Sequence, residues 1–228
     1  MSTRLARADL RPDAVQVAAG LLGARVVHRS PAGLVAVRLT EVEAYAGRRD
    51  PASHAFRGPT PRSRIMFGPA GFLYVYFTYG MHWCANVVCG PDGEASAVLL
   101  RAGEVVSGAE LARARRPAAA RDVDLARGPA RLAAALGLGR EHNGTDLCAP
   151  GSRIWVESPD AGPLGAVHLG PRVGVRGPGG EAAAFPWRFW LAGEPTVSSY
   201  RPGILRRRPA PPDGRLSAGP GATRHPAE

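Results

Sequence analysis

Apolar residues recur along the chain in short runs, and their spacing predicts a mixture of strands and helices. Runs rich in Val, Leu and aromatic residues, bounded by turn residues, are typical of strands. Such runs occupy residues 24–28, 34–45, 72–77, 81–89, 97–102, 153–157, 172–176 and 187–191. Helical spacing, with Gly23 after the first helix and Pro129 in the first turn of the last, predicts three helices. These helices cover residues 13–22, 108–116 and 129–138.

The order of these elements predicts an α+β fold, because several strands form hairpins and regular βαβ alternation is absent. Residues 47–69 form a long polar loop, and such a loop in a compact domain is usually functional or disordered. From about residue 204 the chain is rich in Pro, Gly and Arg. We therefore expect one domain over residues 1–204, followed by a disordered basic tail over residues 205–228.

The formal net charge of +10 favours a polyanionic partner, because neutralising phosphates releases condensed counterions. An Arg-rich composition from a GC-rich genome is the alternative explanation. All 29 basic residues are Arg, and the chain contains no Lys. Since a guanidinium stays protonated and delocalised, Schiff-base catalysis by a side chain is excluded.

The three cysteines and the N-terminus indicate an intracellular protein without a metal site. Cys84, Cys89 and Cys148 form no CxxC motif and no Cys/His cluster with zinc spacing. The first 12 residues lack the apolar stretch of a signal peptide, and no apolar run is long enough to span a membrane. We therefore expect reduced thiols and a cytoplasmic location, near the nucleoid of a bacterium.

Two acidic residues end the longest predicted strand. Alternate residues of a strand share a face, so Glu41, Glu43 and Tyr45 would point the same way. Partial burial of two neighbouring carboxylates would raise the pKa of one of them, as a general base requires, although a solvated strand end is the alternative. Arg101 lies among apolar residues of another predicted strand and needs an acidic partner there, for which Glu43 is a candidate.

The predicted hairpin over residues 72–89 carries an aromatic side chain at its turn. Tyr79 occupies this tip, where small polar residues are usual, so it could be a wedge that enters a base stack. Tyr74 and Tyr76 share a strand face, and the alternative for them is an ordinary aromatic core. Asn86 lies on the returning strand.

The long loop after the acidic strand is a candidate phosphate-binding segment. Its three arginines Arg57, Arg62 and Arg64 alternate with Ser, Thr and an aromatic residue. His54 lies in the same loop, where a lone His is most often a structural hydrogen-bonding group.

Taken together, these segments resemble the alkyladenine (3-methyladenine) DNA glycosylase family of mammals and many bacteria. The similar stretches follow the order of the family over about residues 12–200. They are LTEVEAYAG, DPASHAFRG, TPRSRIMFGPAGFLYVYFTYGMHWCANVV, AVLLRAGEV, RGPARLAAALGL, GPRVGV and PWRFWLAG. Two positions depart from the family pattern: Ser63 replaces an expected Asn, and His82 replaces the Tyr of mammalian members.

The resemblance implies a monomeric single mixed domain with a curved antiparallel sheet, flanking helices, a protruding β-hairpin and no metal or organic cofactor. It implies that Glu43 is the general base that deprotonates a water molecule. It also implies that Arg101 and the backbone carbonyl of Val173 hold this water.

The resemblance further implies a pocket for one base flipped out of double-stranded DNA. Tyr45 and Tyr76 would be its aromatic walls, and His54 would complete it. Asn86 would discourage the exocyclic amine of guanine. Tyr79 would fill the space that the base leaves in the duplex.

These roles predict a base-excision repair glycosylase that hydrolyses the N-glycosidic bond of alkylated or deaminated purines, of the 3-methyladenine or hypoxanthine type. Stacking on the two tyrosines offsets part of the cost of base flipping. Without Lys, a lyase step is not expected, so the enzyme would be monofunctional. The rival hypotheses are a non-enzymatic basic DNA-binding module and a metal-dependent nuclease, which would need a cluster of acidic or His ligands.

Overall fold

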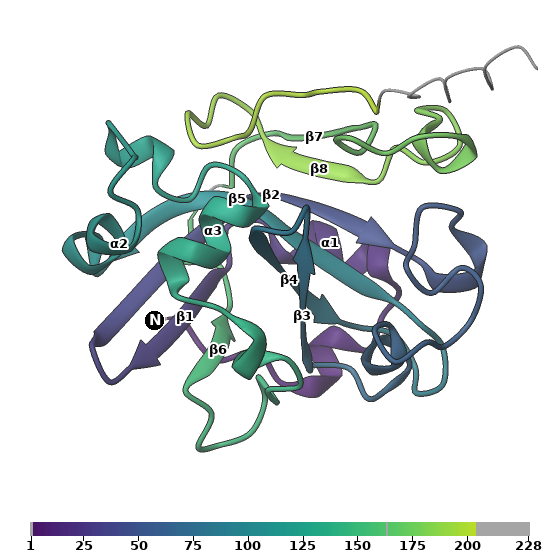
Figure 1. Cartoon of the computed structure of the whole chain (residues 1–228), viewed down its shortest axis with the longest axis horizontal. Helices are drawn as coiled ribbons and strands as arrows, with labels where there is room; N and C mark the ends of the chain where they lie inside the picture. The colour runs from purple at the N-terminus through teal and green to yellow at the C-terminus, as the bar shows by residue number, and fades with distance from the viewer. Residues whose placement is uncertain (1, 163, 204–228) are drawn as a thin grey trace, which may run out of the picture.

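The computed structural model describes residues 2–162 and 164–203, and in this part of the chain eight strands form one open antiparallel sheet (Figure 1). The strands are β1 (Arg25–Ser30), β2 (Gly33–Tyr45), β3 (Leu73–Thr78), β4 (His82–Val88), β5 (Ala97–Ser107), β6 (Ile154–Glu157), β7 (Val167–Gly170) and β8 (Arg188–Leu191). The helices are α1 (Ala14–Leu21), α2 (Ala109–Arg115) and α3 (Pro129–Leu136). The predicted α+β class is confirmed, whereas the expected tail over residues 205–228 lies outside the described residues.

The long strand β2 is the centre of the sheet. The strand order is β3-β4-β5-β2-β1-β6, and β8 joins β2 to β7. The first half of β2 pairs with β1, its second half pairs with β8, and β5 pairs along both halves. The end of β2 that carries the two acidic residues is therefore enclosed between β5 and β8.

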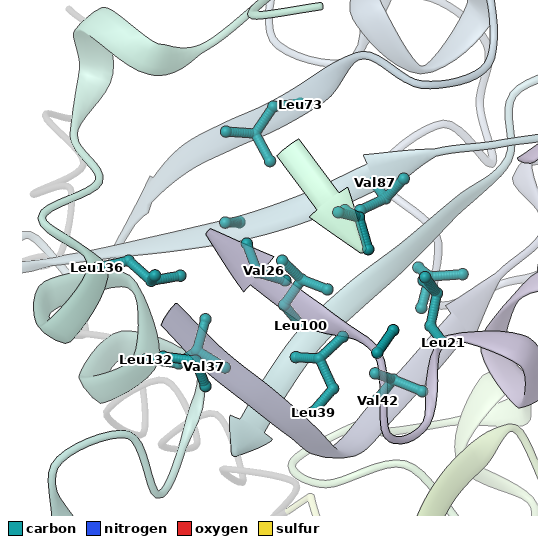
Figure 2. Close-up of a cluster of buried hydrophobic side chains, with 14 of the residues drawn as sticks. Leu21, Val26, Val37, Leu39, Val42, Leu73, Val87, Leu100, Leu132 and Leu136 are labelled. Carbon is teal, nitrogen blue, oxygen red and sulfur yellow. The ribbon is translucent and has the colours of Figure 1, made fainter. Parts of the chain in front are cut away.

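Helices α1 and α3 cover one face of the sheet and close the main hydrophobic core (Figure 2). Leu21 of α1 and Leu132 and Leu136 of α3 belong to one buried cluster with side chains from β1 to β6 and β8. These include Val26, Val37, Leu39, Val42, Leu73, Val87 and Leu100. Burying a side chain of this size contributes about 1.5–3 kcal/mol, so this face is committed to stability and the opposite face is left for function.

The start and end of α1 follow the predicted signals. The carboxylate of Asp13 accepts hydrogen bonds from the N–H groups of Val15 (2.9 Å) and Gln16 (3.0 Å) and so caps the helix. Gly23 follows with a φ of +76°, which a residue with a side chain rarely adopts.

The strand predicted over residues 172–176 is wrong. This segment is an irregular loop, because its polar groups bond to side chains and loop carbonyls instead of a neighbouring strand. The strand β7 just before it was missed, since three of its four residues are exposed and show no alternation. β5 extends five residues beyond the predicted end, where it pairs with the first half of β2.

Candidate active site

A β-bulge in β2 turns the acidic residues away from the core. Leu39 pairs with Gly103 of β5, and Glu41 pairs with the adjacent Ala102, so Thr40 is the extra residue. Core-facing residues are therefore odd-numbered before the bulge and even-numbered after it: Val35, Val37 and Leu39, then Val42 and Ala44. Glu41, Glu43 and Tyr45 consequently share the opposite face, as predicted.

Neighbouring strands extend this face across the sheet. Glu43 pairs with Leu99 of β5, Leu99 with Asn86 of β4, and Asn86 with Tyr74 of β3. Paired residues of antiparallel strands point to the same side. The register thus brings an acid, an amide and a tyrosine from distant parts of the sequence onto one surface.

Glu43 is fully buried, and its carboxylate has three partners. Oε1 accepts a hydrogen bond from the backbone N–H of Val173 (2.7 Å) and lies 3.2 Å from Nη1 of Arg101. Oε2 accepts from the hydroxyl of Tyr45 (2.9 Å). Burial and the charge of Glu43 hold the pKa of Tyr45 well above its usual value, so this hydroxyl keeps the proton that it donates.

The expected pairing of Arg101 with Glu43 is present, but Arg101 is shared with Glu41. Its Nε donates to Oε1 of Glu41 at 2.8 Å. Arg101 is the extra residue of a second bulge, because Leu100 and Ala102 pair with consecutive residues of β2. Burial disfavours the guanidinium charge, yet the two carboxylates more than offset this effect and raise the pKa of Arg101. The sequence did not reveal the other ligands of Glu41, Arg188 and Ser198.

Val173 contacts Glu43 through its backbone N–H. The predicted role concerned its carbonyl, for which the structure gives no partner in the part of the chain that it describes. The loop that carries Val173 is held by its neighbour Arg172, which is fully buried and forms a bidentate ion pair with Asp50 (2.6 and 2.7 Å). Position 173 is therefore fixed by an arginine that sequence reasoning missed.

Arg172 also supports Tyr45 from behind. Its guanidinium carbon lies 4.5 Å from the centroid of the Tyr45 ring, and its Nη1 donates to the carbonyl of Ala44 (2.8 Å). Asp50 balances the charge of Arg172 at the same time. One face of Tyr45 is thus occupied, and only the other is open to a ligand.

A small aromatic cavity lies next to Glu43, with a volume of about 70 Å³. Its lining residues come from β2, β3, β4 and the long loop: Tyr45, Ala52, His54, Met66, Tyr74, Tyr76 and Asn86. The four residues predicted for a base pocket are therefore brought together. Tyr74, for which an ordinary core role was the alternative, joins them.

Aromatic contacts order this cavity. Nδ1 of His54 lies 3.1 Å from the hydroxyl of Tyr74, and its ring meets the edge of Tyr76 with centroids 4.7 Å apart. Desolvation by these rings, followed by the charge of Arg62, lowers the pKa of His54 to about 4. Nδ2 of Asn86 donates to the carbonyl of Tyr74 (3.1 Å), which fixes the orientation of this amide.

The hairpin of β3 and β4 exposes apolar side chains at its tip. Tyr79 is 85% exposed and has a φ of +52°. Among the described residues, it is the only one other than glycine that has a positive φ. Met81 beside it is 68% exposed. A large aromatic residue held in this conformation costs about 1 kcal/mol or more, so the tip is not optimised for stability alone.

One of the three loop arginines, Arg62, contacts this hairpin, and none of the three is in an ion pair within the described residues. Arg57 and Arg64 are exposed, and within the described residues neither has an ion-pair partner. Arg62 donates to the carbonyl of Phe77 (3.3 Å) and lies 4.9 Å from the centroid of the Tyr76 ring. A positive surface therefore borders the aromatic cavity.

The two departures from the family pattern have different surroundings. Ser63 is buried, and its hydroxyl exchanges hydrogen bonds with Thr60 at 2.8 and 3.0 Å, so it organises the arginine loop. His82 is exposed and lines a groove between the hairpin and α3, together with Arg116 and Arg131.

Over residues 2–162 and 164–203, no group of three or more His, Cys, Asp or Glu side chains is arranged to hold a metal ion. In the same part of the chain, no helix has the length and apolar character needed to cross a bilayer. Cys84, Cys89 and Cys148 are free thiols, and the first two are buried.

Comparison with known proteins identifies the family. The family model for methylpurine-DNA glycosylase (MPG) matches residues 8–195. A protein of Streptomyces avermitilis named "Putative 3-methyladenine DNA glycosylase" is 54% identical over 207 residues, which cover 90% of this chain and 96% of the relative. A relative with the same name from Leifsonia xyli is 57% identical over 192 residues, covering 82% and 88%. The chain therefore belongs to the methylpurine-DNA glycosylase family and is a DNA-repair glycosylase rather than a non-enzymatic DNA-binding module.

Proposed function

We propose that the protein flips 3-methyladenine and related purines, including hypoxanthine, out of duplex DNA and hydrolyses their N-glycosidic bond. The observation that carries this proposal is the buried carboxylate of Glu43 beside an aromatic cavity. The names of the relatives support 3-methyladenine as the substrate. The substrate reaches the cavity only after leaving the base stack, because a base inside a duplex is inaccessible.

In the proposed reaction Glu43 is the general base. A water molecule attacks C1′ of the sugar and gives its proton to Glu43, while the electron pair of the N-glycosidic bond leaves with the purine. Because 3-methyladenine carries a positive charge in DNA, it departs as a neutral base without needing a proton. The negative charge of Glu43 also stabilises the oxocarbenium-like sugar, as carboxylates do in glycoside hydrolysis. Arg101 and Val173 orient the carboxylate, and the carbonyl of Val173 is proposed as a further contact of the water.

Tyr45 and Tyr76 are the proposed walls of the base pocket. Electron-rich rings favour a cationic base over a neutral one, and base stacking contributes about 1–3 kcal/mol per base. The cavity has a volume of about 70 Å³, and it is proposed to widen when the base enters. The amide of Asn86, fixed by Tyr74, is proposed to disfavour the exocyclic amine of guanine.

The same site is proposed to lack a lyase activity. A lyase step uses an amine that forms a Schiff base with the sugar, and the chain has no Lys. The product is then an abasic site in an intact strand.

The substitution Glu43→Gln tests the proposal. It keeps the size of the side chain but removes the base, so single-turnover release of 3-methyladenine from a labelled duplex should fall by about 100-fold or more, while binding to the damaged duplex persists. Glu104→Gln is the matched control, because Glu104 lies on the same sheet, exposed and paired with Arg38. Wild-type release by Glu43→Gln would contradict the proposal.

A further inference from the structure

Glu41 is a second fully buried carboxylate, two residues before Glu43, and the proposed reaction does not use it. It accepts four hydrogen bonds. Oε1 accepts from Nε of Arg101 (2.8 Å) and Nε of Arg188 (2.7 Å), and both its oxygens accept from Ser198 (2.7 Å from N–H and 3.0 Å from the hydroxyl). The donors come from β5, β8 and the segment after β8, which meet β2 here, so Glu41 joins three parts of the chain (Figure 1).

These bonds fix how Arg101 faces Glu43. Glu41 holds Nε of Arg101, and the hydroxyl of Ser198 accepts from Nη2 (3.3 Å). Nη1 is left as the nitrogen that approaches Glu43, at 3.2 Å. Glu41 therefore fixes the position of the guanidinium through a contact that leaves Nη1 of Arg101 for Glu43.

The charges of the cluster balance when all four groups are counted. Glu41 and Glu43 supply two negative charges, and Arg101 and Arg188 supply two positive charges. Although burial alone would raise it, the two guanidiniums and Ser198 hold the pKa of Glu41 below its usual value, so Glu41 stays ionised. The neutral groups that also face this cluster are Tyr45, Tyr76 and Cys84. Without Glu41, Arg101 would keep Glu43 as its one carboxylate, and Arg188 would lose its ion-pair partner among the described residues.

We propose that Glu41 is a positioning residue for the glycosylase reaction. It aims Arg101 at Glu43 and takes up part of the positive charge of Arg101, so that this charge is divided between the two carboxylates. This inference rests on the proposed function of Glu43.

The test compares pH–rate profiles of single-turnover 3-methyladenine release for variants that change the charge of the cluster in opposite directions. Glu41→Gln adds one positive charge, which favours the ionised form of Glu43. The acid limb of the profile should move to lower pH by about one unit, and the plateau rate should fall by up to about 100-fold. Arg188→Gln removes a positive charge and should move the limb to higher pH. The double variant restores neutrality and should return the limb toward that of the wild type.

Ser198→Ala is the matched control, because it removes a ligand of Glu41 without changing the charge. It should leave the acid limb in place. Thermal unfolding is measured for each variant at each pH, and rates are compared only at pH values where the variants are folded. If the acid limb of the pH–rate profile stays in place in both Glu41→Gln and Arg188→Gln, the inference is overturned. Glu41 would then have a purely structural role. If Glu43→Gln keeps wild-type release, the proposed function fails instead.

Discussion

At the scale of single residues, the aromatic cavity lowers the pKa of His54. Desolvation and the charge of Arg62 lower the pKa of His54 to about 4, against 6.5 for the free side chain. The unfolded chain therefore binds more protons than the folded one between these values, and the contribution of His54 to stability is lost as the pH falls from about 6.5 toward 4. Because the side chain of His54 is exposed, solvent reduces the size of this effect.

The corresponding prediction is that the NMR titration of His54 has its midpoint well below 6.5. His168, an exposed histidine that stacks on Trp190, gives an internal reference outside the cavity. Tyr76→Ala should raise the midpoint of His54, because it removes the ring at 4.7 Å. A midpoint near 6.5 in the wild type would contradict the desolvation of this side chain.

The sequence predicted which residues form the site better than it predicted which of them contact each other. Strand alternation placed Glu41, Glu43 and Tyr45 on one face, and the apolar surroundings of Arg101 required an acidic partner. Both predictions are confirmed. The role of Glu41 as the principal partner of Arg101 could not be predicted, since it depends on two bulges and on a segment about 157 residues away in the chain.

At the scale of elements, the hairpin of β3 and β4 trades stability for a projecting side chain. Tyr79→Asn should leave the free energy of unfolding unchanged or raise it by up to about 1 kcal/mol, because Asn tolerates a positive φ better than Tyr does. Affinity for damaged duplex should fall by up to about 100-fold, since the stacking ring is lost. Fluorescence anisotropy and chemical denaturation measure the two effects.

Two comparisons isolate the wedge role of Tyr79. Tyr79→Phe keeps the ring and should bind like the wild type. Tyr79→Asn should lose less affinity for DNA that already contains an extrahelical abasic site than for a damaged duplex. Equal losses on the two DNAs would show that Tyr79 is an ordinary contact residue.

Elements with a clear hydrophobic pattern were predicted, and those held by polar side chains were not. The strands with long apolar runs and all three helices lie where their patterns indicated, within a few residues. The loop after β7 resembled a strand because Arg172 and Arg176 alternate with Val173 and Val175. Its conformation follows instead from the buried pair of Arg172 with Asp50, which are 122 residues apart and leave no local signal.

At the scale of the whole molecule, the distribution of acidic partners distinguishes two classes of arginine. Some exposed arginines remote from the cavity lie in ion pairs, such as Arg113 with Asp122 (2.6 Å) and Arg121 with Asp124 (2.9 Å). Arg57 and Arg64, on the loop beside the cavity, have none among the described residues. Part of the net charge of +10 is therefore carried without an acidic partner by the loop beside the cavity, where a polyanion could reach it.

This distribution predicts which arginines set the salt dependence of DNA binding. The double variant Arg57→Ala/Arg64→Ala should lose affinity for any duplex, and each lost phosphate contact should reduce the slope of log K against log salt by about 0.9. Arg113→Ala removes an equally exposed charge whose partner is already Asp122, so its slope should match that of the wild type. Single-turnover base release at saturating enzyme should be unchanged in both variants, because neither touches Glu43. Equal changes of slope in the two variants would mean that binding senses only the net charge of the protein, and the loop would then have no special position against the DNA.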